Sequence, residues 1–341
     1  MDIEYHYWVT GIIAHGAGFN EDEAQIIAYS SQYVDDNDVC FTVKDRITEK
    51  KYRNFVSQTM DILKPKDQLM RIYPIFHFVP GDPSHVLARR HDGKMHVLNT
   101  TPDSEHANAL LSAAFKSADD VKSYQIGVAS HAYVDSWAHQ NFVGWHDSFN
   151  AVGVNVLPNI GHADAQHHPD WPCHRWDDTR LVDREVNNNH RFLSAAERLF
   201  SHYCDYLITQ KRYAVENRPA WAALEKELAA IFCSTCSGHT NEGKEKRIAQ
   251  YKKLAPWLNK YDEQLWFNEA VETKIRGLKD SCDGLENKFF LFKDNHYWRD
   301  GAEYEKTKWY KFQQAVKEHE RFALGDLSGI FDQMGNDISK V

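Results

Sequence analysis

The sequence lacks the features that mark several protein classes. Six cysteines in 341 residues are too few for a disulfide framework. No apolar stretch approaches the roughly 18 residues that a membrane-spanning helix needs, and acidic residues stand near the N-terminus where a secretory signal requires basic ones. We therefore expect a soluble, cytoplasmic protein with reduced thiols, and export by a non-Sec route is the alternative.

Positive charge is also in short supply. The 49 Asp and Glu residues outnumber the 40 Lys and Arg residues, which gives a formal net charge of −9 at pH 7. Proteins that coat nucleic acid need Lys and Arg to neutralise phosphates, so stable nucleic-acid binding is not expected, although an enzyme that cuts a phosphoester is still allowed. The absence of G-x-S-x-G, Walker A and G-x-G-x-x-G motifs argues against serine hydrolases and common nucleotide-binding folds.

Strand signals are sparse, so we predict an all-α fold, a multi-helix bundle with long irregular loops. Asn20 and Glu23 form a capping-box pattern before a helix over 21–36, and another helix begins near Ser104. Segment 120–142 is predicted to be a buried helix. Amphipathic surface helices are predicted over 191–216, 220–232, 243–280 and 301–324.

Two regions interrupt the helical pattern. Residues 71–102 allow a short hairpin with a turn at Asp92-Gly93, and residues 143–180 form a long irregular connection rich in His, Asp, Asn and Trp. We expect a metal-binding catalytic core over 1–210 and a helical extension over 211–341 packed on it, or a single domain containing both.

Histidine, by contrast, is abundant. Of 19 histidines, 14 lie before residue 175. The most informative spacing is His131-x3-Asp135-x3-His139. On an α-helix these side chains fall within an arc of roughly 80° but spread over about 12 Å, too far for one ion. A central Asp suits a bridge between two metals about 3.5–4 Å apart, each also bound by one histidine. The alternative, a buried helix with satisfied polar groups, is costly for three such side chains.

Further candidate ligands occur in the N-terminal half. Each alone has an ordinary interpretation, such as a solvated helix-end carboxylate, a core histidine or a surface loop residue. Their joint presence with the helical row favours Asp35, His77 and His162 in particular. The sequence leaves open the choice between Asp35 and Asp36. The full set of further candidates is His6, His15, Asp35, Asp36, His77, His162 and Asp164.

These residues carry a family resemblance. Tyr33-Val34-Asp35, then Phe76-His77-Phe78, then His131-x3-Asp135 and later histidines resemble the all-helical zinc-dependent phospholipase C superfamily, which includes the single-strand-specific zinc nucleases of fungi and plants. The match spans roughly residues 1–170. The segment HAYVDSWAHQNF is also similar to one in uncharacterised bacterial proteins.

The resemblance implies two or three zinc ions with a bridging helix Asp and a metal-bound water as nucleophile. Carried over, Asp35, His77, His131 and Asp135 would hold one metal of a pair. His139, His162 and Asp164 would hold another, and His6 or His15 would serve the third.

The chain also departs from the family pattern. Three residues separate Asp135 from His139 where the family has five, and position 166 is Gln. The family's N-terminal Trp, whose amine binds zinc, has no counterpart in MDIEYHYW, where the tryptophan is Trp8.

The resulting expectation is a zinc-dependent hydrolase of a phosphodiester, either a phospholipid or a nucleotide. Asp35 or Asp36 would orient or deprotonate the attacking water. Trp137 and Trp145 would contact a base or acyl chain, and Arg175 would contact phosphate oxygens.

Three alternatives remain at this stage. A His-Asp doublet phosphohydrolase acting on nucleotides has candidate doublets at His91-Asp92 and His146-Asp147. A non-catalytic zinc protein would use Cys233-x2-Cys236 with His239. An exported effector would share the chemistry but not the biological role.

Overall fold

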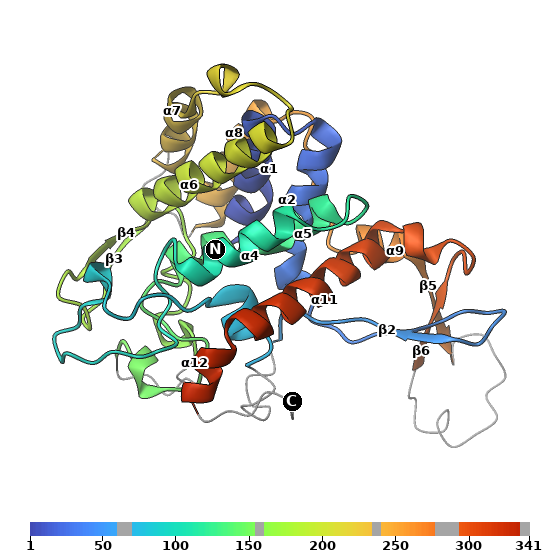
Figure 1. Ribbon diagram of the computed structural model, residues 1–341, viewed down its shortest axis with the longest axis horizontal. Helices are drawn as coiled ribbons and strands as arrows, with labels where there is room; N and C mark the ends of the chain where they lie inside the picture. The colour runs from blue at the N-terminus through green and yellow to red at the C-terminus, as the bar shows by residue number, and fades with distance from the viewer. Residues whose placement is uncertain (60–69, 154–159, 234–239, 277–292, 335–341) are drawn as a thin grey trace.

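Helix α5 (Lys122–Ala138) is the central element of the helical body. Every residue from Tyr124 to Ala138 is buried, as expected of a helix without a polar face. Its main neighbours are α2 (Glu21–Asp36), α4 (Glu105–Phe115), α6 (Asn188–Thr209) and α11 (Lys308–Asp326). Figure 1 shows these helices stacked around it. The computed structural model describes residues 1–59, 70–153, 160–233, 240–276 and 293–334.

The contact between α2 and α5 is unusually close at Gly127. A Cβ at this position would lie 2.5 Å from the Ile27 carbonyl oxygen and 2.5 Å from the Ser30 Cβ. Only glycine therefore permits this approach. The approach brings the C-terminal turn of α2 alongside the second half of α5, where the polar row of that helix lies.

The three helix predictions in the first half of the chain are confirmed. Asn20 and Glu23 form both hydrogen bonds of the capping box that begins α2. Ser104 caps α4 through the Ala107 N–H, and α5 lies within the predicted segment 120–142. Two π-helical turns, η1 (Glu4–Val9) and η2 (Tyr73–His77), carry His6 and His77.

The remaining helices surround this centre. Helix α1 follows η1 directly and packs on α2 and α6, and α8 packs on η1 and α7. Trp309 and Phe312 of α11 belong to the same hydrophobic core as α5. The bounds are α1 Thr10–Ala17, α7 Trp221–Phe232, α8 Asn241–Leu254, α9 Leu265–Ala270, α12 Ser328–Gln333, with short turns η3 Val86–Ala88, η4 Ser148–Asn150, η5 Ala163–Ala165, η6 Val215–Asn217 and η7 Tyr304–Lys306.

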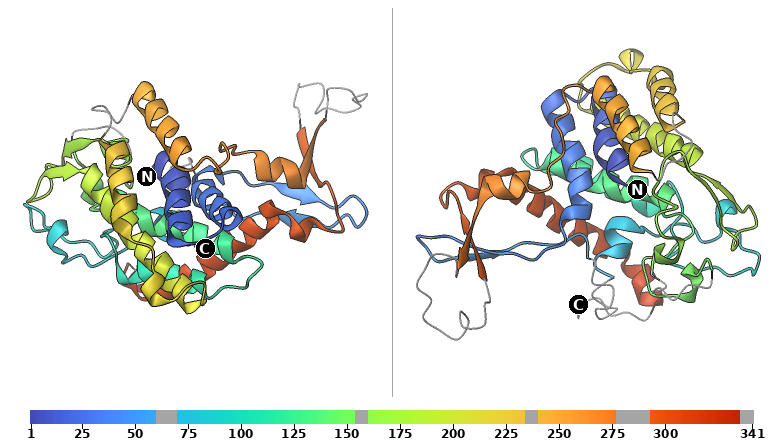
Figure 2. Two further views of the ribbon diagram at one scale, coloured as in Figure 1. Left: turned by 90° about the horizontal axis from the view of Figure 1, so that it is seen from above. Right: turned by 180° about the vertical axis from the view of Figure 1, so that it is seen from behind.

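A four-stranded sheet projects from one side of the helical body (Figures 1 and 2). Its strand order is β2-β1-β6-β5, and β1 pairs with β6 in parallel while the other pairs are antiparallel. A separate hairpin joins β3 and β4. The strands are β1 Thr42–Lys44, β2 Lys51–Arg53, β3 Arg175–Asp177, β4 Glu185–Asn187, β5 Val271–Arg276 and β6 Lys293–Trp298.

The all-α prediction is therefore wrong, because the chain is a mixed α/β protein dominated by helices. Segment 243–280 was predicted to be helical but changes to strand at Val271. Its charged residues resemble an amphipathic helix, whereas the strand is stabilised by pairing with distant β6. The predicted hairpin at Asp92-Gly93 is also wrong. Gly93 does form a turn, with φ of 69°, but the neighbouring Arg90 pairs with Leu181.

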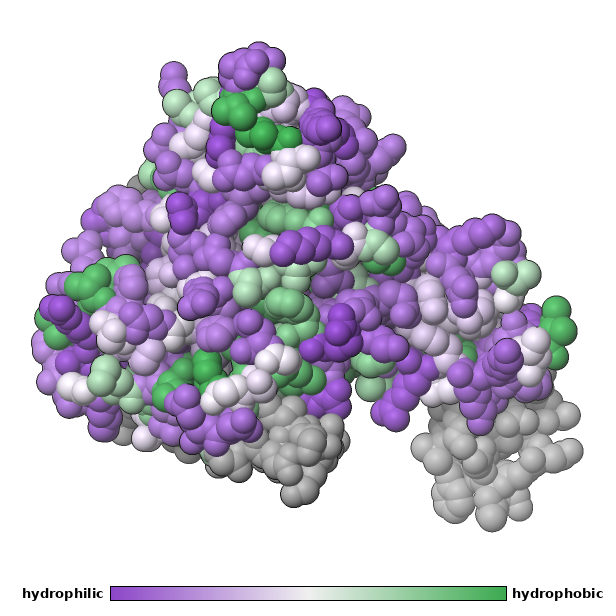
Figure 3. Space-filling view, viewed as in Figure 1, coloured by the Kyte–Doolittle hydropathy of each residue, from purple (hydrophilic) through white to green (hydrophobic). Residues whose placement is uncertain are grey.

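The surface in Figure 3 is mostly hydrophilic, with small scattered hydrophobic patches. Among the described residues, no helix is long and apolar enough to cross a membrane.

Candidate metal centre

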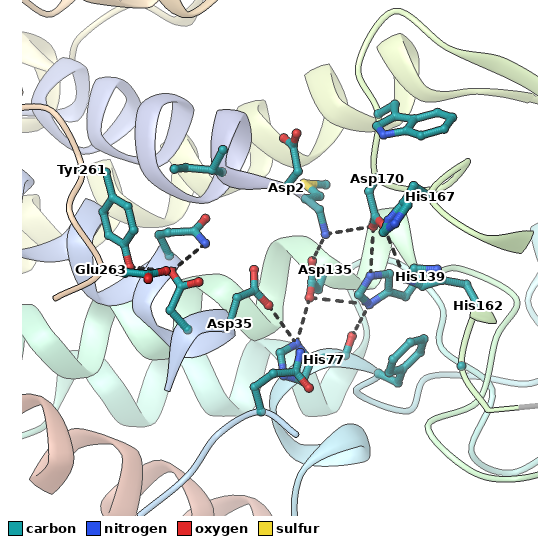
Figure 4. Close-up of a pocket in the computed structure, with 18 of the residues that line it drawn as sticks. Asp2, Asp35, His77, Asp135, His139, His162, His167, Asp170, Tyr261 and Glu263 are labelled. Atoms are coloured by element: carbon teal, nitrogen blue, oxygen red, sulfur yellow. Dashed lines mark hydrogen bonds and ion pairs between the residues drawn. The ribbon is translucent and has the colours of Figure 1, made fainter. Parts of the chain in front are cut away.

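A pocket of about 1280 Å³ lies where the start of the chain, the C-terminal end of α2, η2 and the loop after Ile160 meet the second half of α5. Carboxylates and imidazoles converge at its floor (Figure 4). They come from segments far apart in the sequence, and the close approach of α2 to α5 at Gly127 brings two of those segments together.

Asp135 is the hub of this cluster. It lies one helical turn after His131 and one turn before His139, which follows the last residue of α5. Its Oδ2 is 3.2 Å from His131 Nε2, 3.5 Å from His77 Nδ1 and 3.5 Å from His139 Nδ1. Its Oδ1 is 3.1 Å from His6 Nε2. Oδ2 therefore faces His131, His77 and His139, whereas Oδ1 faces His6.

The first group consists of His77, His131 and Asp135, and Asp35 approaches its two imidazole nitrogens. His131 Nε2 lies 3.1 Å from His77 Nδ1, and both nitrogens lie 3.7 Å from Asp35 Oδ1. Together with the two distances to Asp135 Oδ2, the separations run from 3.1 to 3.7 Å. Tetrahedral coordination with bonds of about 2.0–2.1 Å places ligand atoms roughly 3.3–3.4 Å apart, close to the separations of 3.1, 3.2 and 3.5 Å among His77, His131 and Asp135.

Four of the histidines are oriented in the same way. Each places one ring nitrogen on a backbone carbonyl oxygen, so that nitrogen carries the proton and donates it. The other nitrogen faces the cluster and is left as an acceptor. The pairs are His77 Nε2 to Ser57 O at 2.9 Å, His131 Nδ1 to Ser31 O at 2.8 Å, His139 Nδ1 to His77 O at 2.7 Å, and His162 Nδ1 to Gln166 O at 2.6 Å.

A second group forms around Asp170. Its Oδ1 is 3.4 Å from His139 Nε2, and its Oδ2 is 3.6 Å from His162 Nε2 and 3.6 Å from His167 Nδ1. Asp164, the predicted partner of His139 and His162, is not in this group. Its Oδ2 accepts hydrogen bonds from two backbone N–H groups, those of residues 152 and 153, and so shapes the loop.

The third group contains the first residue of the chain. The Met1 amine lies 2.5 Å from Asp135 Oδ1 and 3.4 Å from Asp170 Oδ1. His6 stacks on His131 with ring centroids 3.9 Å apart, and its Nε2 is 4.0 Å from Asp35 Oδ2. His6 therefore lies in the cluster.

Burial and mutual charge set the protonation of these groups. Burial lowers the pKa of His6 to about 4 and the pKa of His162 to about 4. Burial opposes ionisation of Asp135, but His139, the Met1 amine and His131 hold its pKa well below the ordinary value. Burial lowers the pKa of the Met1 amine, yet Asp135 and Asp170 raise it on balance to about 11.

The cluster contains more acceptors than the described chain can satisfy. Both ring nitrogens of His6, Oδ2 of Asp135 and Oδ1 of Asp170 are buried and make no hydrogen bond with described residues. Buried oxygens and imidazole nitrogens that face one another need a proton or a cation between them. The donor set of imidazole and carboxylate suits zinc and similar divalent metals, so these residues fit a metal cluster.

Other sequence candidates lie elsewhere. His15 packs against Trp257 with ring centroids 4.8 Å apart, away from the cluster. Asp36 lines the pocket, but its Oδ2 accepts hydrogen bonds from Tyr261 at 2.5 Å and Gln32 at 3.1 Å. Of the two adjacent residues Asp35 and Asp36, it is Asp35 that faces the histidines.

The predicted substrate contacts do not line the pocket. Trp137 donates a hydrogen bond to Ser194, Trp145 packs on a small separate core, and Arg175 pairs with Glu185 on the β3–β4 hairpin. Their positions follow from packing that the sequence pattern did not reveal. The pocket walls instead include Tyr73, Phe78, Trp171, Lys244 and Lys260.

Sequence reasoning missed two members of the cluster, Asp170 and the Met1 amine. The segment NIGHADAQHHPDW offers both Asp164 and Asp170 after His162, and its spacing gives no reason to choose the second.

Comparison with known proteins adds the family. Residues 1–327 match the model described as "Family of unknown function (DUF6765)". No curated protein and no solved structure matches the chain.

Proposed function

Because the chain belongs to this family of unknown function, its activity must be inferred from the site, and we propose that it is a metal-dependent phosphodiester hydrolase. The centre would hold two or three divalent ions, with zinc as the best match to the donors. Asp35, His77, His131 and Asp135 would form one site, and His139, His162 and Asp170 another. His6 would serve the third with Asp35 and Asp135.

The observation that carries the proposal is the shared orientation of His77, His131, His139 and His162. A histidine that only stabilises the fold has no reason to turn an acceptor nitrogen toward a carboxylate. Four of them do so around Asp135 and Asp170, while their N–H groups are held by backbone carbonyls. This carbonyl-held arrangement is typical of histidines that bind metal.

The bound ions would supply Lewis-acid chemistry, lowering the pKa of water and neutralising charge on the phosphoryl and leaving oxygens. The protein residues would do the rest. The Asp35 side chain is 26% exposed whereas that of Asp135 is 1% exposed, so Asp35 is the carboxylate placed to orient a water on the pocket side. Lys260 lines the pocket as a cation placed to attract phosphate oxygens, and Lys244 lines it while paired with Asp2.

The pocket walls suit a substrate with a substantial organic part. Tyr73, Phe78 and Trp171 provide aromatic surface around the floor, and the volume of about 1280 Å³ accepts a nucleotide or a phospholipid headgroup with part of its chains. Both substrate classes remain in the proposal.

The alternatives gain no support from the described residues. A His-Asp doublet phosphohydrolase needs its doublet on a helix, but Asp92 lies in a turn and Asp147 caps the short η4. Neither doublet lines the pocket. Cys233 contacts Asn189, and Cys236 and His239 lie outside the described residues.

The first test is elemental analysis of untagged protein. Two or three zinc-like ions per chain support the proposal, one ion indicates a mononuclear centre, and none after reconstitution contradicts it. The same preparation is assayed with bis(p-nitrophenyl) phosphate, with the monoester p-nitrophenyl phosphate as control. Diester turnover should disappear with a chelator and return with Zn²⁺.

A further inference from the structure

His6 differs from the other histidines of the metal centre in how it is held. Neither of its ring nitrogens makes a hydrogen bond within the described chain, whereas His77, His131, His139 and His162 are each oriented by a backbone carbonyl. Its ring stacks on His131 and approaches Asp135 Oδ1, and its backbone belongs to η1. The position of η1 therefore determines the position of the His6 ring.

Helix α8 fixes η1 through a buried ion pair. Arg247 donates from Nε to Glu4 Oε2 at 2.8 Å and from Nη2 to Glu4 Oε1 at 2.7 Å. The side chains of Arg247 and Glu4 are 0% and 2% exposed. One turn earlier on α8, Lys244 pairs with Asp2 at 2.9 Å. Figure 2 shows α8 beside the N-terminal helical segment.

The ion pair is a costly way to stabilise the fold. The free-energy cost of removing two charges from water is only partly offset by their mutual attraction. Apolar residues of similar volume often stabilise a protein as much or more. A bidentate Arg–Glu contact does fix geometry, because the planar guanidinium meets both carboxylate oxygens in one orientation. Glu4 lies between Met1 and His6, the two members of the cluster that η1 and its preceding residues supply.

We propose that the Glu4–Arg247 pair is a positioning element of the metal centre. Through it, α8 sets the place of the first turn of η1, so that His6 and the Met1 amine face Asp35 and Asp135. Arg247 acts on the centre through Glu4. The inference rests on the proposed function, because it concerns the third ion of the same centre.

The test compares ion binding in matched variants of the full chain. Arg247→Met breaks the pair but leaves Glu4 buried without its partner, so the double variant Glu4→Gln/Arg247→Met removes both charges and protects the fold. Arg247→Lys keeps the charge without the bidentate contact. Arg212→Met is the control, because it breaks another two-bond Arg–Glu pair, Arg212 with Glu23, away from the centre.

Zn²⁺ content is measured by elemental analysis, affinity by titration with Zn²⁺, and folding by far-UV circular dichroism and urea unfolding. We expect the double variant to bind one ion about 10–100-fold more weakly, the usual effect of removing a residue that supports a ligand. The other ions should keep wild-type affinity, Arg247→Lys should recover part of the loss, and Arg212→Met should match wild type.

Two results would overturn the inference while leaving the proposed function intact. One is wild-type affinity for every ion in the double variant. The other is equal weakening of all ions together with a loss of helical structure, which would show a general role in folding. A wild-type chain that binds no metal would overturn both proposals.

Discussion

Replacing Asp135 by Asn tests the centre at its hub. The two side chains have nearly the same shape, so α5 and its packing should persist. The change removes the negative charge and leaves one oxygen where two are now shared among His6, His77, His131, His139 and the Met1 amine. A carboxylate that bridges two ions should contribute to the binding affinity for both.

The size of the effect follows from this geometry. Loss of a residue that only supports a ligand typically weakens metal binding by about 10–100-fold. Loss of a bridging ligand should exceed that range, so we expect Asp135→Asn to bind at least two of the ions more than about 100-fold more weakly. Diester turnover should fall to the level of the metal-free protein, because the same ions would activate water and bind phosphate.

The assay is Zn²⁺ titration with elemental analysis, followed by diester turnover at saturating Zn²⁺. His15→Ala is the control, because the sequence offered His15 as the alternative to His6 but it packs on Trp257. It should retain wild-type ion content and turnover. If Asp135→Asn kept all ions within threefold of wild-type affinity and remained active, the bridging role and the proposed chemistry would both be refuted.

Two further substitutions test how the site is assembled. Asp170→Asn should remove one ion, whereas Asp164→Asn should keep all ions because the Asp164 carboxylate accepts hydrogen bonds from loop N–H groups. Equal losses in elemental analysis would contradict this assignment. Gly127→Ala should destabilise the fold by about 1–3 kcal/mol, because its Cβ would lie 2.5 Å from the Ile27 carbonyl, and Gly153→Ala, which meets nothing within 4 Å, is the control. Unchanged urea unfolding of Gly127→Ala would show that α2 and α5 do not require this close contact.

Local patterns were enough to predict the parts of the site that lie on helices. The Asn20–Glu23 cap and the apolar spacing after it define α2 up to Asp35. The four-residue spacing from His131 to His139 places three polar groups on one face whatever surrounds the helix. These features depend on residues close in sequence, so they can be predicted without knowing the fold.

The strands and Asp170 depend on distant parts of the chain. Val43 of β1 pairs with His296 of β6, and no local sequence pattern predicts that partner. The loop after Ile160 carries positive φ at Gly161 and at Gln166, 52° and 53°, which redirect its path. As a result, the Asp170 side chain lies next to His139, whereas the Asp164 side chain accepts hydrogen bonds within its own loop. A non-glycine residue in this conformation has no sequence signature, so the exchange was not predictable.

The charge of the proposed metal centre would allow an acidic chain to bind the proposed anionic substrate. A net charge of −9 repels a phosphodiester, and the pocket walls add Asp36, Asp262 and Glu263 to that field. Three carboxylates, Asp35, Asp135 and Asp170, oppose four positive charges if two divalent ions are bound, and six if three are bound. Either occupancy leaves local positive charge at the floor of an otherwise acidic pocket. The ions would therefore bind the substrate as well as activate water, and Lys260 at the pocket wall would guide the substrate inward.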